Sequence, residues 1–393
     1  MTAVRLARPG LFALVAGGCL ALGGTAPLVV GIASAYALAG CALALLRAAR
    51  GPGVAADPFE LALLLAAAAA AAHMLLPGPA GAPPFEARIE TYRIVSIAAL
   101  AALSFRGGRR CGGAFLLEPA ALAVGLVSLF GLAQRLAGRQ AFWLGSPLPE
   151  NAVPFGPFLN RNHFASLAAA GLPLAALPFG SLDRRRKAIG AAGVLVCLLG
   201  ALVPGSRTGA AALGAAALAL LAVRPSPEGR RLAIGAFLAI GAAAAALPGG
   251  VLDRVLGAGP GQRLSIWRDS LRLVARAPVL GHGPGSFLDA YPSVQTFPSP
   301  FVVSHAESDL VQQLVETGIA GTLPLILAFG LALRRAAKAA GNGEKEAAAC
   351  FSSLAALAVA ALLDTPWRGF GFGAFGAIVL GSAAACGNGR GKA

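Results

Sequence analysis

The stretch Ala210–Val223 reads AAALGAAALALLAV and contains no charged side chain. A second stretch, Leu61–Ala72, reads LALLLAAAAAAA and has the same character. Over its 393 residues the chain is 57% hydrophobic and only 12% charged, whereas a soluble domain carries about 25% charged residues. A bilayer can absorb this much apolar sequence, because each membrane-spanning helix needs about 20 apolar residues. The composition therefore predicts an all-α, polytopic membrane protein.

Twelve apolar segments are expected to form transmembrane helices. They are residues 11–24, 26–46, 58–76, 92–106, 114–137, 163–180, 187–203, 207–223, 230–247, 314–333, 347–363 and 370–387. Residues 249–313 are too polar to span a membrane, and loops of this length are usually functional. We expect a single integral-membrane domain over residues 1–393, in which 249–313 is a large loop with short helices.

The basic residues indicate the orientation of the chain. With both termini in the cytoplasm, the inner segments carry 20 of the 32 basic residues and 6 of the 17 acidic residues. Such an excess of Lys and Arg marks the cytoplasmic loops of membrane proteins. The pattern predicts a bacterial inner-membrane protein whose loop 249–313 faces the periplasm. Because the net charge of +15 is spread over many short loops, it does not indicate nucleic-acid binding.

Two polar motifs lie at predicted outer helix ends. Asn160, Arg161 and Asn162 open the sixth span, where amide donors and a cation at a helix N-terminus suit an anionic or sugar ligand. Capping of the helix by one of the asparagines is the alternative. Arg207 is the only charged residue between the seventh and eighth spans. It is either a ligand-binding cation or an interfacial anchor.

A third motif is the amphipathic segment from Arg263 to Arg276. One face is expected to be an apolar stripe and another a basic one. The apolar residues are Leu264, Trp267, Leu271 and Val274, and the basic ones are Arg268, Arg272 and Arg276. This pattern is typical of a helix that lies at the membrane interface. Arg263, at its start, is the better candidate for a ligand contact.

The fourth motif, Ser304–Asp309, places His305, Glu307 and Asp309 directly before the tenth span. A carboxylate or an imidazole there can serve as a general base. The alternative is an acidic helix start that the helix dipole stabilises. Clusters of His or Cys with metal-ligand spacing are absent from the sequence, so neither a bound metal nor another cofactor is expected.

Together the four motifs resemble the O-antigen ligase and polymerase superfamily. The matching features are Asn-x-Asn-x-x-Ala at 160–165, Ser206-Arg207, Arg263-x-x-x-Trp267 followed by Pro278-x-x-Gly281-x-Gly283, and Ser308 followed after nine residues by Gly318-x-x-Gly321. The resemblance covers most of the chain. In similar ligases a catalytic histidine directly precedes the position of Ser308. Here that position holds Glu307, and His305 lies two residues earlier.

The resemblance implies a GT-C-like helical fold and an inverting, metal-independent glycosyltransferase. Its partners would be a glycan carried on undecaprenyl diphosphate, a glycan or lipid A-core acceptor, and membrane lipids. Arg207 and Arg263 would bind the diphosphate and stabilise its departing charge. Glu307, or else His305, would activate the acceptor hydroxyl in the periplasm. The residues Asn160, Arg161, Asn162 and Asp309 would support the site.

A transporter or flippase of a lipid-linked or anionic solute is the alternative function, because twelve spans are common among transporters. The sequence places no charged pair in the middle of a predicted span and shows no paired broken helices. Both features would be expected of such a transporter.

Overall fold

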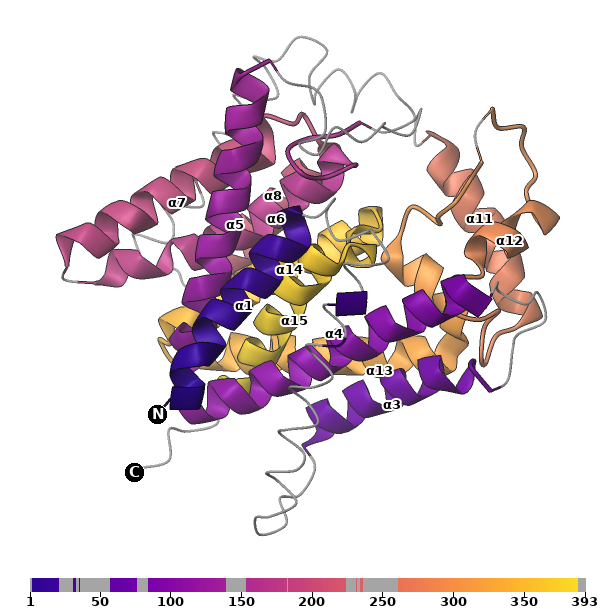
Figure 1. Cartoon of the computed structure of the whole chain (residues 1–393), viewed down its shortest axis with the longest axis horizontal. Helices are drawn as coiled ribbons and strands as arrows, with labels where there is room; N and C mark the ends of the chain where they lie inside the picture. The colour runs from indigo at the N-terminus through magenta and orange to yellow at the C-terminus, as the bar shows by residue number, and fades with distance from the viewer. Residues whose placement is uncertain are drawn as a thin grey trace.

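The computed structural model describes residues 2–20, 31–32, 35, 57–75, 84–138, 153–181, 183–223, 231, 234–235, 261–300 and 302–387. Apart from two isolated β-bridges between residues 153 and 160, the regular secondary structure of these residues is helical. The longer helices are α1 (Thr2–Leu20), α3 (Pro58–Ala72), α4 (Pro84–Cys111), α5 (Gly113–Leu136), α6 (Arg161–Ala175), α7 (Arg184–Leu202), α8 (Arg207–Val223), α11 (Gly261–Arg276), α13 (Asp309–Gly341), α14 (Lys345–Leu363) and α15 (Phe370–Ala385) (Figure 1). The short ones are η2 (Leu177–Gly180), α12 (Phe287–Ala290), η3 (Tyr291–Ser293) and η4 (Pro366–Arg368).

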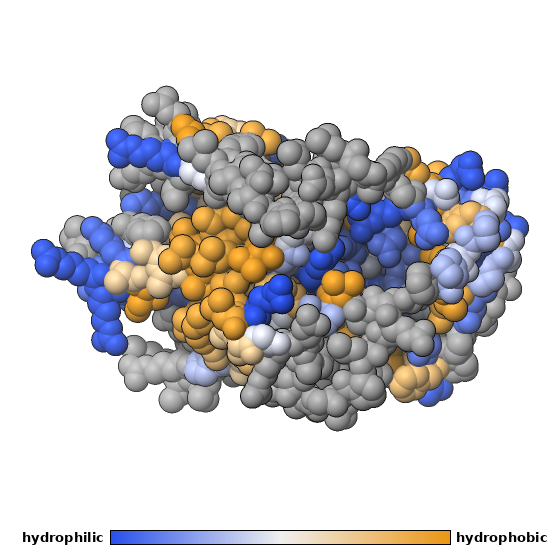
Figure 2. Space-filling model, turned by 90° about the horizontal axis from the view of Figure 1, so that it is seen from above, coloured by the Kyte–Doolittle hydropathy of each residue, from blue (hydrophilic) through white to orange (hydrophobic). Residues whose placement is uncertain are grey.

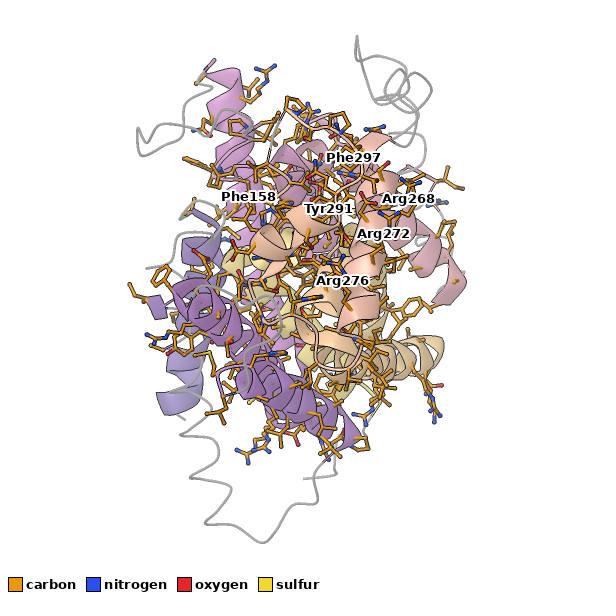
Figure 3. The ribbon with its side chains drawn as sticks, turned by 90° about the vertical axis from the view of Figure 1, so that its right-hand side faces the viewer. Phe158, Arg268, Arg272, Arg276, Tyr291 and Phe297 are labelled. Atoms are coloured by element: carbon orange, nitrogen blue, oxygen red, sulfur yellow. The ribbon has the colours of Figure 1, made fainter. Side chains whose placement is uncertain are left out.

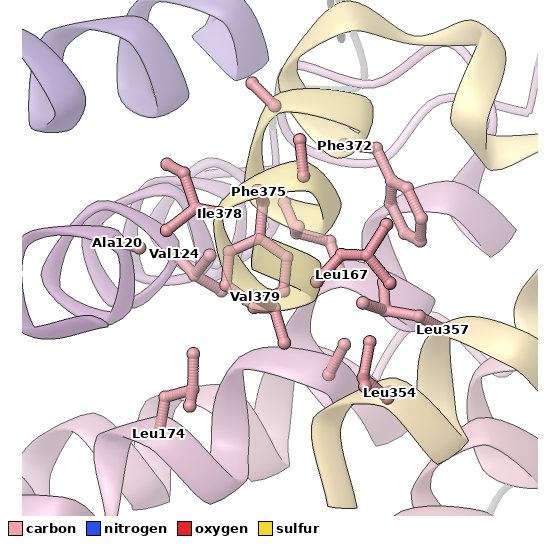
Figure 4. Packing of buried hydrophobic residues seen from close by; sticks show 14 of the residues in the cluster. Ala120, Val124, Leu167, Leu174, Leu354, Leu357, Phe372, Phe375, Ile378 and Val379 are labelled. Atoms are coloured by element: carbon pink, nitrogen blue, oxygen red, sulfur yellow. The ribbon is translucent and has the colours of Figure 1, made fainter. Parts of the chain in front are cut away.

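Helix α15 lies at the centre of the body. All residues from Phe370 to Ala384 are buried, and a helix that is apolar on every side needs partners all round. Its side chains pack among those of α5, α6 and α14 (Figure 4). Small residues permit this close approach: a Cβ atom at Gly376 would overlap the ring of Trp367, and one at Gly381 would overlap the backbone of α4. Helix α15 therefore holds α4 and η4 in place.

Several helices are suited to a bilayer. Three of the described helices, α5, α13 and α14, are long and apolar enough to cross a membrane. Shorter apolar helices are Pro9–Leu20 within α1, together with α3, α8 and α15. On the face seen in Figure 2, hydrophobic residues gather in one zone along the long axis, with hydrophilic residues to either side. The protein is thus a membrane-embedded helical protein.

Ten of the twelve predicted spans coincide with helices. They correspond to α1, α3, α4, α5, α6 with η2, α7, α8, α13, α14 and α15. The spans predicted at 26–46 and 230–247 lie outside the described residues. The number of twelve transmembrane helices stays a prediction.

Ion pairs join helix ends that the charge pattern assigns to the cytoplasm. Arg335, near the end of α13, donates to Oδ1 of Asp57 at 2.9 Å. Arg106, near the end of α4, pairs with Glu60 of α3. Along α13, Arg335 lies roughly 39 Å from Asp309 at a rise of 1.5 Å per residue. Because a hydrocarbon core is about 30 Å thick, α13 is long enough to connect this ionic end to the opposite side of a bilayer.

Helix α13 is broken at Gly318, whose φ of 59° lies in the left-handed region. The break removes the two helical hydrogen bonds that the amides of Ile319 and Ala320 would otherwise make. The loop 278–283 supplies replacement partners on both sides of the break. The four hydrogen bonds, 2.8–2.9 Å long, run from Ile319 N to Pro278 O, Ala320 N to Val279 O, His282 N to Val315 O and Gly283 N to Glu316 O. Helix α13 is therefore longer than the predicted span at 314–333, and it consists of two segments, one before and one after Gly318.

Helices α11, α12 and η3 form a lobe at the right of Figure 1, within the predicted loop 249–313. Its core contains Ile266 and Leu273 of α11 and the stacked rings of Phe287 and Tyr291, whose centroids are 5.1 Å apart. The predicted short helices of this segment are confirmed.

The packed face of α11 differs from the predicted apolar stripe. Leu264 and Leu271 are about half exposed, and the buried residues are Ile266, Asp269, Ser270 and Leu273. Asp269 lies on the packed face, where it accepts a hydrogen bond from the amide of Thr296 at 2.9 Å. Contact of the apolar stripe with the membrane interface stays a prediction. The arginines of the predicted basic face, Arg268, Arg272 and Arg276, follow one side of α11 (Figure 3).

Candidate functional site

Asp364, the residue directly after α14, is where the polar motifs meet. Its side chain is 2% exposed and accepts hydrogen bonds from Nδ2 of Asn162 at 2.9 Å and from the amide of Thr365 at 2.8 Å. Nε2 of His163 lies 3.2 Å from Oδ1, and Nη2 of Arg263 lies 3.7 Å from Oδ2. Sequence analysis did not identify Asp364, although its contacts join three of the predicted motifs.

The two asparagines of the first motif have different roles. Asn160 is the N-cap of α6, and its Oδ1 accepts a hydrogen bond from the amide of Asn162 at 2.8 Å. The side chain of Asn162 turns instead to Asp364. Arg161 is partly exposed at the first position of α6. The capping interpretation therefore holds for Asn160, whereas the side chain of Asn162 binds Asp364.

The second motif joins the same network through Ser206. Its Oγ donates to Oδ1 of Asn162 at 2.8 Å and accepts from the amide of Gly209 at 3.0 Å. Arg207, the first residue of α8, has an exposed side chain next to this network. Because this side chain is exposed, its guanidinium is accessible to a ligand.

Arg263 reaches from the lobe to the end of α14. Its Nη1 donates to the carbonyl of Leu363 at 2.7 Å, and its Nη2 lies 3.2 Å from Oε2 of Glu307 and near Asp364. The side chain is 33% exposed. Guanidinium groups bind phosphate as readily as carboxylate, so an accessible arginine in this setting can exchange a carboxylate for an anionic ligand.

The residues around Glu307 are held in an unusual conformation. With φ of 54°, Glu307 is the one non-glycine residue of the described chain in the left-handed region, which costs about 1–2 kcal/mol. Such strain persists only where the surroundings impose it, often at functional sites. Asp309, two residues later, donates its amide to the carbonyl of Asp364 at 3.0 Å and accepts at Oδ2 from the amide of Trp367 at 3.1 Å. These bonds tie the start of α13 to the segment 364–368.

A second ionic group uses the other end of that segment. Arg368 donates to Oε1 of Glu90 at 2.9 Å and to Oε1 of Glu316 at 3.1 Å, and Glu90 also pairs with Arg93. We call Glu90, Arg93, Glu316 and Arg368 the Arg368 cluster. We call Asn162, His163, Arg263, Glu307 and Asp364 the Asp364 cluster. Sequence analysis missed the Arg368 cluster, and its one local signal is the i, i+3 spacing of Glu90 and Arg93.

A comparison with protein families finds a match within the sequence of the chain. The family model described as O-antigen ligase matches residues 192–326. This match supports an assignment to the O-antigen ligase and polymerase superfamily. The matched range includes Arg207, Arg263 and Glu307, whereas Asn162 and Asp364 lie outside it. The resemblance predicted from the motifs is confirmed, and it points to a glycan-transferring enzyme that acts on a lipid-linked glycan and an acceptor. Among curated proteins no match was found.

Glu307 stands where similar O-antigen ligases carry histidine, and its surroundings favour proton binding. Burial and the negative charge of Asp364 raise the pKa of Glu307, although Arg263 opposes this. Burial also opposes ionisation of Asp364, but contacts with His163, the Thr365 amide and Arg263 lower its pKa to about 2. Of the two carboxylates beside Arg263, Asp364 therefore stays ionised and Glu307 is the stronger base.

His305, the alternative base predicted from the sequence, has a different environment. Its Nδ1 lies 2.7 Å from Oγ of Ser304. Burial and the positive charge of Arg368 lower the pKa of His305 to about 3. The imidazole is thus neutral at physiological pH and only weakly basic.

Proposed function

We propose that this protein is an inverting, metal-independent glycosyltransferase that moves a glycan from undecaprenyl diphosphate to an acceptor hydroxyl on the periplasmic side of the bacterial inner membrane. The observation that carries the proposal is the 3.2 Å contact between Arg263 and Glu307, next to the buried Asp364. A phosphate-binding cation and a carboxylate base therefore lie side by side. The family assignment supplies the reaction class, and the contacts suggest the roles.

Arg207 and Arg263 are the proposed diphosphate-binding residues. Each guanidinium can donate two parallel hydrogen bonds to phosphate oxygens. Because Nη2 of Arg263 is now bonded to Glu307, a bound diphosphate would replace the carboxylate as its partner. Donor binding would thus release Glu307 toward the acceptor.

In the proposed step, the acceptor hydroxyl oxygen attacks the anomeric carbon from the face opposite the diphosphate. The new carbon–oxygen bond forms as the bond to the phosphate oxygen breaks, and that electron pair leaves with the lipid diphosphate. The hydroxyl proton passes to Glu307. A single displacement inverts the configuration of the sugar. The two arginines stabilise the charge that develops on the diphosphate.

Asp364 is proposed as a positioning residue. It fixes Asn162, His163 and the guanidinium of Arg263 around one buried, ionised carboxylate. Groups that orient the residues in contact with substrate are commonly worth 10- to 100-fold in activity.

The positive-inside pattern supports the outward orientation of the site. The ionic pairs of Asp57 and Glu60 lie among residues that this pattern places in the cytoplasm. The Asp364 cluster gathers residues that the pattern places outside the cytoplasm.

The proposal is tested with purified protein, a glycan on undecaprenyl diphosphate and two acceptors, lipid A core and a second lipid-linked repeat. Transfer to the first identifies a ligase, and extension of the second identifies a polymerase. Arg207→Ala and Arg263→Ala are each expected to reduce transfer by about 10²–10³-fold, as for other groups that stabilise a developing anion. Arg268→Ala, an exposed arginine of the same helix as Arg263, is the control.

Full activity in both the Arg207→Ala and Arg263→Ala variants would exclude the diphosphate-binding role. A transporter or flippase would move the donor between leaflets of a vesicle and leave it uncleaved, which would overturn the proposed reaction.

A further inference from the structure

Two hydrogen bonds hold the peptide groups that precede Glu307. Oε1 of Gln312 accepts from the amide of Ala306 at 2.7 Å, and Nε1 of Trp267 donates to the carbonyl of Ala306 at 2.9 Å. Ala306 is fully buried, so neither peptide group has water as a substitute partner. A change in φ of Glu307 would swing the peptide that carries the Ala306 carbonyl. The bond from Trp267 resists that rotation.

Gln312 is itself held from its other side. Its Nε2 donates to Oε1 of Glu316 at 2.5 Å, and Glu316 accepts from Arg368. The side-chain amide has one workable orientation, because a flip would set its NH2 group against the Ala306 amide and its oxygen against a carboxylate. Gln312 is 3% exposed. The Arg368 cluster therefore determines which way Gln312 presents its acceptor.

We infer that Gln312 is a positioning residue for Glu307, connecting the Arg368 cluster to the strained backbone of the base, with Trp267 as its counterpart on the neighbouring peptide. The inference rests on the proposed function, in which Glu307 takes the acceptor proton. Without Gln312 the buried amide of Ala306 loses its acceptor, the left-handed turn relaxes, and the carboxylate moves away from Arg263.

Gln312→Met tests this inference, because it keeps the length of the side chain and removes both hydrogen bonds. We expect kcat to fall roughly tenfold, within the range for groups that orient a reacting residue. The KM for the lipid-diphosphate donor is expected to stay within about twofold, since Arg207 and Arg263 remain. The acid limb of kcat/KM, which reports the free enzyme, should move to higher pH, because Arg263 lowers the pKa of Glu307 and that contact weakens.

Two further variants calibrate the result. Trp267→Phe removes one donor and keeps an aromatic ring, and we expect a smaller loss of roughly threefold in kcat. Gln313→Met is the matched control, because Gln313 lies next to Gln312 and its Nε2 donates to Thr317 within the same helix. The control is expected to keep the kcat and pH profile of the wild type.

A double-mutant cycle separates positioning from general stability. If Gln312 acts through Glu307, the double variant Glu307→Gln/Gln312→Met should have a kcat less than about twofold below that of Glu307→Gln alone. Losses that multiply across the two sites would overturn the inference.

Hydrogen exchange gives a readout that does not depend on activity. Peptides covering residues 302–308 should exchange faster in Gln312→Met and in Trp267→Phe, while peptides of α14 stay as in the wild type. If the wild type does not transfer glycan, the proposed function fails, yet the exchange still reports on the conformation of Glu307. If the wild type transfers glycan and Gln312→Met changes neither exchange nor kcat, the positioning role is excluded.

Discussion

The Asp364 and Arg368 clusters share the segment 364–368 but combine the same chemical groups in different proportions. The Asp364 cluster sets two carboxylates beside one arginine, Arg263, which is 33% exposed. The Arg368 cluster sets two carboxylates against two arginines, and none of its four side chains is more than 17% exposed. Enclosed charges have fixed partners, whereas a carboxylate beside an accessible cation can change its protonation and its partner. This difference indicates that the Asp364 cluster is suited to catalysis and that the Arg368 cluster is a structural ion network.

The largest effect is expected when the proposed general base of the Asp364 cluster, Glu307, is removed. Glu307→Gln removes the proton acceptor at constant shape, and we expect glycan transfer by the purified protein to fall by about 10²–10⁴-fold. His305→Ala, assayed beside it, should lose less than about tenfold, because that imidazole is weakly basic. The reverse order of the two losses would assign the base to His305.

Breaking the Arg368 cluster should affect stability instead. Arg368→Met leaves the buried Glu316 without its ionic partner, while Glu90 keeps Arg93, and loss of a buried ionic partner typically costs about 3–5 kcal/mol. Arg263→Met should lower the unfolding temperature much less, because Glu307 is partly exposed and the buried Asp364 keeps its contacts with Asn162 and His163. Thermal unfolding in detergent measures both. Equal shifts in the two variants would contradict the distinction between the clusters.

A smaller effect is expected at the carboxylate that organises the site. Asp364→Asn keeps the size of the side chain and removes its charge, so His163 and Arg263 lose their ionic partner. We expect transfer to fall by about 10- to 100-fold while the protein still inserts in the membrane. Asp289→Asn, at an exposed carboxylate in α12, is the control and should behave as the wild type.

The smallest expected effect is a displacement of the pH profile. The base must be ionised to accept a proton, so kcat/KM should fall as the pH drops through the raised pKa of Glu307 in the free enzyme, above the ordinary value of 4.5. In Asp364→Asn the nearby negative charge is gone, the pKa of Glu307 falls, and the acid limb of the residual activity should move to lower pH. An acid limb that stays in place would show that these two carboxylates do not interact.

The membrane helices could be predicted because a bilayer imposes both a length and a composition on each span. Their bounds were harder to predict. Helix α4 begins at Pro84, whereas the predicted span begins at residue 92, because Glu86, Arg88 and Glu90 lower the hydropathy before it. Glu90 is buried in the helix because it pairs with Arg93 and with Arg368, which is far away in the sequence.

The polar motifs could also be predicted, but their partnerships could not. Asn160 and Asn162 are the same residue type two positions apart, yet one caps a helix and the other binds Asp364. Asp364 carries no local signal, because a single acid after an apolar helix is an ordinary turn residue. Only the packing of α6, α11 and α14 brings its partners to it.

The break of α13 at Gly318, with the loop bonded to it, has a consequence for the position of the site along the membrane normal. The loop 278–283 is bonded to both segments of α13 and follows directly on α11, so the lobe is fixed to a membrane helix at a defined level along its length. A one-residue insertion in α11 would turn Arg263 by about 100° and move it by about 1.5 Å along the helix axis, whereas the attachment of the loop to α13 would stay at the same level. In the proposed enzyme, the arginine is thereby held at a constant distance from the bilayer centre, where the phosphates of a lipid-linked donor have a fixed depth of their own.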